Sequence, residues 1–249
     1  MDALTHTLSG LAAGTAVSVF TVKERGVLRS LPAALAGMAG GFMPDIDAVS
    51  LWRGFDPLFS RLHGSPPSGK EIYFGKWAFS HHGAMHSILA GVFFAFLLLF
   101  VSGVVRLIYK KWKSPRRAFT ASMPASIALF AGYCMHLLGD IPTPGYVWGG
   151  IRLWWPASFY TGGLGRIWWW NNYDIFLVVL SCVIVNFMLL AASAVIRRTA
   201  VKYLPLIVLL TMIAASAMMV SGRQYTYNYT SYKKQFAELE KKSLDEQRS

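Results

Sequence analysis

Histidine and aspartate residues occur in this sequence at spacings that suit metal binding. His136 and Asp140 lie four residues apart at the end of an apolar run. Four residues of an α-helix turn by about 400°, so both side chains point from one helix face. Pro142 follows and ends the helix, which places the pair at a membrane boundary. A hydrogen-bonded cap is the structural alternative, but an ionisable pair in a membrane segment is costly and favours a metal site.

Three upstream segments offer the remaining groups of such a site. The candidates there are His6, Asp45, Asp47, His81, His82 and His86. Asp45 and Asp47 are expected to supply two ligands, or one ligand and a general base, with a plain turn as the alternative. Helical spacing would stack His82 on His86, and two of the three histidines in that cluster are expected to bind the metal. His6 is a single histidine, so it could bind the metal or have a purely structural role.

Four further residues have a functional and a structural interpretation. Arg152 and Arg166 could bind a substrate phosphate or lipid head groups. Ser87 could bind substrate or cap a helix. Asp174 could be another metal ligand or a favourable charge at a helix N-terminus.

The composition indicates an integral membrane protein. Of the 249 residues, 54% are hydrophobic and 14% charged, whereas about a quarter of a soluble domain is charged. The net charge of +12 does not indicate a nucleic-acid partner, because many Lys and Arg residues lie in short turns between apolar runs. Cys134 and Cys182 both lie inside apolar runs, which argues against a disulfide scaffold.

Six apolar runs are predicted to form transmembrane helices. They cover residues 2–22, 31–43, 87–109, 119–139, 173–196 and 203–220. The second run is short for a span of about 20 residues. We therefore predict an all-α, polytopic helical membrane protein with one domain over residues 1–220. Its outer loops would be residues 44–86 and 140–172, with aromatic residues of the second loop at head-group level, and residues 221–249 would form a polar tail.

The basic turns predict how the protein is oriented. Lys and Arg gather near residues 23–29, 110–117 and 197–202, and the positive-inside rule places these turns in the cytoplasm. The histidines and aspartates named above then all lie at the opposite, non-cytoplasmic helix ends. This convergence predicts a single site.

Taken in order, these residues resemble the YdjM-like family. The matching segments are Thr5-His6, Pro44-Asp45-Ile46-Asp47, His81-His82-Gly83 through His86-Ser87, and His136 through Asp140 with Thr143 and Gly145. The resemblance implies a metal-dependent hydrolase of the bacterial inner membrane, and some members are controlled by the SOS repressor. His82 stands where the family usually has arginine, and Met85 where it has threonine. We include His82, Thr143 and Asp174 as further candidates for the metal site.

The string from His136 to Pro144 is also similar to the His-x-x-Gly-Asp stretch of zinc-dependent phospholipase C and related single-strand nucleases. Those all-helical enzymes bind a zinc cluster and cleave phosphate esters. The resemblance implies that His136 and Asp140 are ligands, with Asp45 or Asp47 as ligand or base. No histidine follows His136, so one or two ions are expected rather than three.

Together these features predict a hydrolase that cleaves a phosphoester of a membrane lipid or lipid-linked substrate with metal-activated water. Zinc is the expected metal and manganese the second choice. A metalloprotease lacks support because the chain has no His-Glu-x-x-His helix. A non-catalytic metal-binding or transport protein would also use such residues, and so would a purely structural polar cluster. The sequence gives no oligomeric state.

Overall fold

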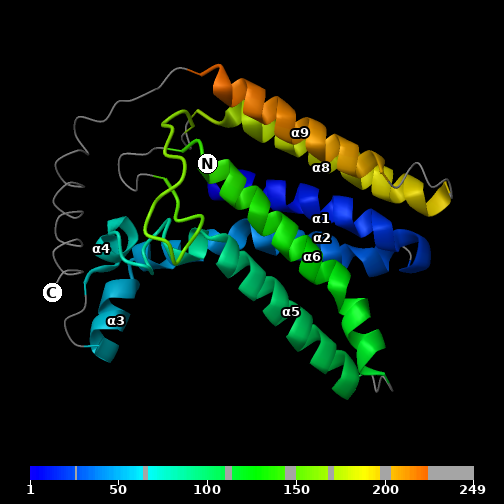
Figure 1. The fold of residues 1–249 in the computed structure, drawn as a ribbon, viewed down its shortest axis with the longest axis horizontal. Helices are drawn as coiled ribbons and strands as arrows, with labels where there is room; N and C mark the ends of the chain where they lie inside the picture. Colours follow the sequence, from blue (N-terminus) through cyan, green and yellow to red (C-terminus); the bar gives the residue numbers. More distant parts are fainter. Residues whose placement is uncertain are drawn as a thin grey trace.

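The protein is all-helical, as predicted (Figure 1). Its structure, a computed structural model, describes residues 1–25, 27–63, 67–109, 114–143, 150–167, 171–196 and 203–223. The long helices are α1 (Ala3–Arg25), α2 (Val27–Phe42), α5 (Ile88–Tyr109), α6 (Pro115–Asp140), α8 (Tyr173–Val195) and α9 (Leu204–Ser221). Most of the predicted polar tail lies outside the described residues.

Five described helices, α1, α5, α6, α8 and α9, are long and apolar enough to cross a membrane. The remaining predicted span corresponds to α2, which has 16 residues. At 1.5 Å per residue this helix is about 24 Å long, less than the roughly 30 Å of a bilayer's hydrocarbon core. The chain continues from α2 directly into η1 (Met43–Leu51), so the shorter helix ends where the candidate aspartates begin.

Small residues allow α1, α2 and α6 to approach one another closely. A Cβ atom added to Gly37 would lie 2.5 Å from the Cα of Gly14, and one added to Gly132 would lie 2.0 Å from the carbonyl oxygen of Gly37. Gly40 and Gly41 make similar backbone contacts with α6 and α1. Such close contacts between small residues are typical of helix packing in membranes. The close packing of α1, α2 and α6 holds together the helix ends that carry the candidate ligands.

The helix directions gather all of the candidate ligands at one end of the molecule. α1, α5 and α8 begin at this end, and α2, α6 and α9 return to it (Figure 1). The side chain of Asn172, just before α8, donates to Asp2 just before α1, and Arg223, just after α9, donates to the carbonyl oxygen of Asn171. The last residues of α1, α5 and α8 and the first residues of α2, α6 and α9 therefore lie at the opposite end.

Two connecting segments cover the end with the candidate ligands. The predicted loop 44–86 contains η1, α3 (Phe55–His63), α4 (Gly69–Phe74) and η2 (Ala84–His86). The Tyr133 hydroxyl of α6 donates to the carbonyl oxygen of Met85. Residues 150–167 of the aromatic loop form turns, and Ile88 N–H donates to Leu153 O at 3.0 Å. Residues 144–149 and 168–170 of that loop, which include several of its tryptophans, lie outside the described residues.

Candidate metal centre

α6 supplies a histidine and an aspartate from one face, as their spacing predicted. His136 Nε2 and Asp140 Oδ2 are 2.9 Å apart, and both side chains are buried. The other ring nitrogen of His136, Nδ1, contacts the carbonyl oxygen of Gly41 at 2.8 Å. Because a carbonyl oxygen only accepts, Nδ1 carries the proton and Nε2 keeps its lone pair for a metal ion.

His86 of η2 and Asp45 of η1 complete a cluster of four donor atoms. His86 Nε2 lies 3.3 Å from His136 Nε2 and 3.5 Å from Asp140 Oδ2. Asp45 Oδ1 lies 3.6 Å from the Nε2 atom of each of these two histidines. We call His86, His136, Asp45 and Asp140 the donor quartet.

Five of the six separations within the donor quartet are close to those around a tetrahedral metal ion. Metal–ligand bonds of about 2.0–2.2 Å give a regular tetrahedron with edges of about 3.3–3.6 Å. The contacts above span 2.9–3.6 Å. Two carboxylates would balance the charge of a divalent cation, which offsets the cost of burying both of them. The donor quartet therefore fits a divalent cation.

His6 of α1 lies on the other side of Asp140. Its Nε2 is 3.0 Å from Asp140 Oδ1, and its ring stacks on that of His136 with centroids 3.9 Å apart. His6, His136 and Asp140 each offer a donor atom to a second group that could hold a metal. The two oxygens of Asp140 thus face different histidines, so this carboxylate can serve one ion or bridge two.

Sequence reasoning missed two residues that position His6. Asp2 Oδ1 accepts a hydrogen bond from Thr5 N–H at 2.9 Å, which caps the start of α1. The Asn172 amide donates to the same carboxylate and, at 3.3 Å, to the Thr5 hydroxyl. An aspartate directly before a helix is a capping signal that could have identified Asp2. No sequence signal connects it with Asn172, which is 170 residues away.

Asp47 lies behind the donor quartet and contacts two histidines. Its Oδ1 is 3.0 Å from His81 Nδ1, and its Oδ2 is 4.0 Å from His86 Nδ1. The structure thus separates the two aspartates of η1. Asp45 contacts the Nε2 atoms of His86 and His136, whereas Asp47 is hydrogen-bonded to the His81 ring.

His82 approaches the site from a turn. Its Nδ1 donates to the carbonyl oxygen of Gly150 at 3.1 Å, and its Nε2 is 4.0 Å from Asp140 Oδ2. The backbone of His82 has a φ of 64°, and α5 begins only at Ile88, so the predicted helical stacking of His82 on His86 is wrong. The turn still brings one nitrogen each of His81, His82 and His86 within 4.8 Å of one another.

The surroundings of His82, His86 and Asp45 favour the protonation states that metal ligands need. Desolvation lowers the pKa of His86 and lowers that of His82 further below the usual value, so both imidazoles stay neutral. Burial opposes ionisation of Asp45, but its contact with His86 and the positive charge that His136 and His6 carry when protonated outweigh that effect and lower its pKa. Neutral imidazoles and an ionised carboxylate are the metal-binding forms.

The two predicted substrate-binding arginines lie on segments bonded to the site. Arg152 N–H donates to the His82 carbonyl oxygen at 3.0 Å. Its buried side-chain Nε has no hydrogen-bond partner among the described residues. Arg166 N–H donates to the Pro142 carbonyl oxygen at 3.0 Å, two residues after Asp140. Both backbones are thus anchored next to candidate ligands.

Three predicted residues have structural contacts instead. Thr143 Oγ1 donates to the Asp140 carbonyl oxygen at 2.6 Å and caps α6. Ser87 Oγ accepts from Ala90 N–H at 3.1 Å and caps the start of α5, in agreement with its structural interpretation. Asp174 is about half exposed and pairs with Arg223. None of the three belongs to the His/Asp groups among the described residues.

Comparison with known protein families gives a match over most of the chain. The family model of the YdjM inner membrane protein matches residues 1–223 of the chain, which include every residue of the site. No curated protein and no solved structure matches the chain significantly.

Proposed function

Since the chain belongs to the YdjM inner membrane protein family, we propose that it is a membrane-embedded, metal-dependent hydrolase. We further propose that it cleaves a phosphoester of a lipid or lipid-linked substrate. The observation that supports this most directly is the donor quartet. Two imidazole nitrogens and two carboxylate oxygens gather there, and five of their six separations lie between 2.9 and 3.6 Å.

We propose zinc as the metal, because two nitrogen and two oxygen donors in a tetrahedron suit zinc better than manganese, which prefers octahedral oxygen sites. A zinc ion held by three members of the donor quartet would leave one coordination position open, where it would act as a Lewis acid that lowers the pKa of a water molecule and polarises a phosphoryl oxygen. His6, His81 and His82 are further nitrogen donors near the donor quartet, so we propose one or two ions.

The chain itself offers a proton acceptor beside the donor quartet. Asp47 Oδ1 lies 3.0 Å from His81 Nδ1, so the carboxylate orients the ring and determines which of its nitrogens carries the proton. We assign the pair Asp47 and His81 as the general base, and Asp45 as a ligand. Arg152, with its buried side-chain Nε, would bind the phosphate of the substrate.

The position of the site favours a lipid substrate. The ligands lie at the ends of helices that are long and apolar enough to span a membrane, where a phosphate group of a lipid resides. The three basic turns predicted from the sequence follow the opposite ends of these helices. By the positive-inside rule the site would face the non-cytoplasmic side of the inner membrane.

A transport function has less support. A permeation path needs polar groups through the bilayer, whereas α5 from Ile88 to Val105 contains no charged residue. The described ligands all gather at one end of the helices.

The test is hydrolysis by purified protein in detergent, metal-free and reloaded with zinc, against phospholipids that carry mono- and diester phosphates. We expect zinc-dependent phosphate or head-group release by the wild type. Asp47→Asn should still bind zinc but lose most of this activity, and Asp174→Asn should match the wild type. Zinc-loaded wild type that releases nothing from any of these lipids would refute phospholipid hydrolysis.

A further inference from the structure

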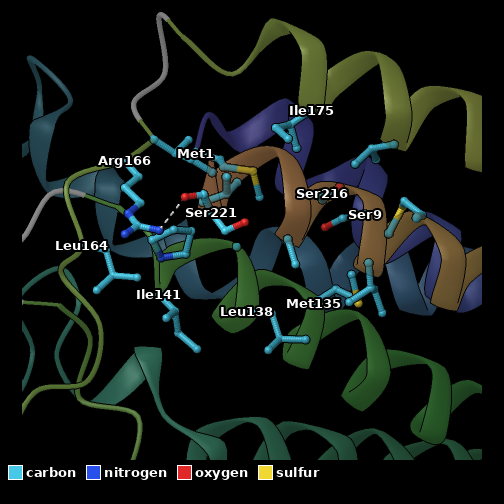
Figure 2. Close-up of a pocket in the computed structure, with 18 residues that line it drawn as sticks. Met1, Ser9, Met135, Leu138, Ile141, Leu164, Arg166, Ile175, Ser216 and Ser221 are labelled. Carbon is cyan, nitrogen blue, oxygen red and sulfur yellow. Dashed lines mark hydrogen bonds between the residues drawn. The ribbon is translucent and has the colours of Figure 1, made fainter. Parts of the chain in front are cut away.

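A cavity of about 320 Å³ lies among α1, α6, α8 and α9 (Figure 2). Its walls are mostly aliphatic and methionine side chains, among them Met135, Leu138, Ile175, Val179 and Met212. All four helices are candidate membrane spans. The molecule that such walls would meet in a bilayer is a lipid chain, because burying methylene groups against apolar side chains is favourable.

The cavity and the candidate metal centre share two helices. Ser9 lines the cavity, and its hydroxyl donates to the His6 carbonyl oxygen at 2.8 Å. Gly139 lines it as well, and a Cβ atom added there would lie 2.9 Å from His6 Cε1. Ile141, the residue after Asp140, belongs to the same wall (Figure 2). A lipid chain in the cavity would therefore lie one layer of residues away from the candidate metal ligands.

The cavity has a cationic group at its polar end and no acidic residue in its lining. Arg166 lies there, and its Nη1 donates to the Ser221 carbonyl oxygen at 3.1 Å (Figure 2). No carboxylate pairs with Arg166 within the described part of the chain. Farther in, the buried Ser216 Oγ has no hydrogen-bond partner among the described residues. This lining is complementary to an apolar chain with an anionic head.

We propose that the cavity binds one acyl chain of an anionic phospholipid, with the lipid phosphate at Arg166. The volume is at the small end of the range for ligand pockets, about 300–1,000 Å³, and suits one chain rather than two. The phosphate would then lie near the end of α6, where the Arg166 N–H donates to the carbonyl oxygen of Pro142, two residues after Asp140. That the bound lipid is the substrate rests on the proposed function. Binding of the lipid in the cavity does not.

Native mass spectrometry of metal-free, delipidated protein tests the proposal. Phosphatidylglycerol is added in detergent, and diacylglycerol with the same chains serves as the ligand without phosphate. We expect the wild type to retain one phosphatidylglycerol and little diacylglycerol. Ser216→Trp, which fills the cavity, should retain neither, whereas Met218→Trp, on the exposed face of α9, should match the wild type. Equal retention by the two tryptophan variants would overturn the proposal.

A second variant keeps the test decisive if Ser216→Trp does not fold. Arg166→Gln leaves the cavity open but removes the cation, so phosphatidylglycerol retention should fall about tenfold, towards that of diacylglycerol. Unchanged retention by Arg166→Gln would contradict the assignment of the phosphate. Because binding is measured without metal, lipid retention without hydrolysis would refute only the proposed function. Hydrolysis without retention would refute only the cavity assignment.

Discussion

Asp45 and Asp47 are chemically identical and two residues apart, yet the structure gives them different contacts. Asp45 Oδ1 lies 3.6 Å from both His86 Nε2 and His136 Nε2. Asp47 contacts the outer nitrogens, at 3.0 Å for His81 Nδ1 and 4.0 Å for His86 Nδ1. Asp45→Asn should therefore remove a candidate ligand, whereas Asp47→Asn should only loosen the His81 ring.

The expected magnitudes follow from these contacts. Loss of an outer partner of a metal-binding histidine typically lowers metal affinity 10–100-fold, or about 1.4–2.7 kcal/mol. We expect Asp47→Asn to lower zinc affinity by no more than the low end of that range, about tenfold, because its hydrogen bond is with His81, outside the donor quartet, and its Oδ2 is 4.0 Å from His86 Nδ1. Asp45→Asn should exceed it, because one of four donors and one of two balancing charges are lost.

Zinc affinity is measured by competition with a chelator in detergent-purified protein. Asp174→Asn serves as the control, since Asp174 pairs with Arg223 away from the donor quartet, and its affinity should equal that of the wild type. The reasoning would be refuted if Asp47→Asn weakened zinc binding as much as Asp45→Asn, or if Asp45→Asn bound zinc normally.

Two further predictions concern stability. Burial lowers the pKa of His82 in the folded state. The stability that neutral His82 contributes is therefore complete above its unfolded-state pKa of about 6.5 and is lost as the pH falls below that value. The loss of unfolding free energy is about 1 kcal/mol between pH 6.5 and 5.5. The melting temperature of metal-free His82→Asn should therefore depend less on pH than that of the wild type, and parallel curves would contradict this. Gly132→Ala should destabilise the protein by about 1–3 kcal/mol in thermal unfolding, because its Cβ would lie 2.0 Å from the Gly37 carbonyl oxygen. Gly222→Ala, with no atom closer than 3.7 Å to its Cβ, should be neutral, and equal melting temperatures for the two variants would count against the close helix packing.

Periodicity and topology predicted much of the arrangement of the helices and ligands. The spacing of His136 and Asp140 determines a shared helix face, and their 2.9 Å contact agrees with it. The basic turns and apolar runs predicted which helix ends meet, and His6, Asp45 and His86 lie at those ends. These features depend on helix geometry and chain direction, which a sequence records.

The local geometry of the connections was not predictable in the same way. His82 lies in a turn with a positive φ, so it reaches Asp140 from a direction that helical spacing does not describe. The different contacts of Asp45 and Asp47 depend on the path of η1, because residues two apart along a chain can face either way. The hydrogen bond from Asn172 to Asp2 joins segments 170 residues apart, and no local pattern specifies such a pair.

The metal content per chain of detergent-purified protein, measured for the wild type beside His136→Ala, tests the donor quartet most directly. We expect one or two equivalents of zinc in the wild type, and loss of metal in a His136→Ala variant that still elutes as a folded protein. Absence of metal from both proteins, even after reloading with zinc or manganese, would contradict a metal centre and leave a structural polar cluster as the better explanation.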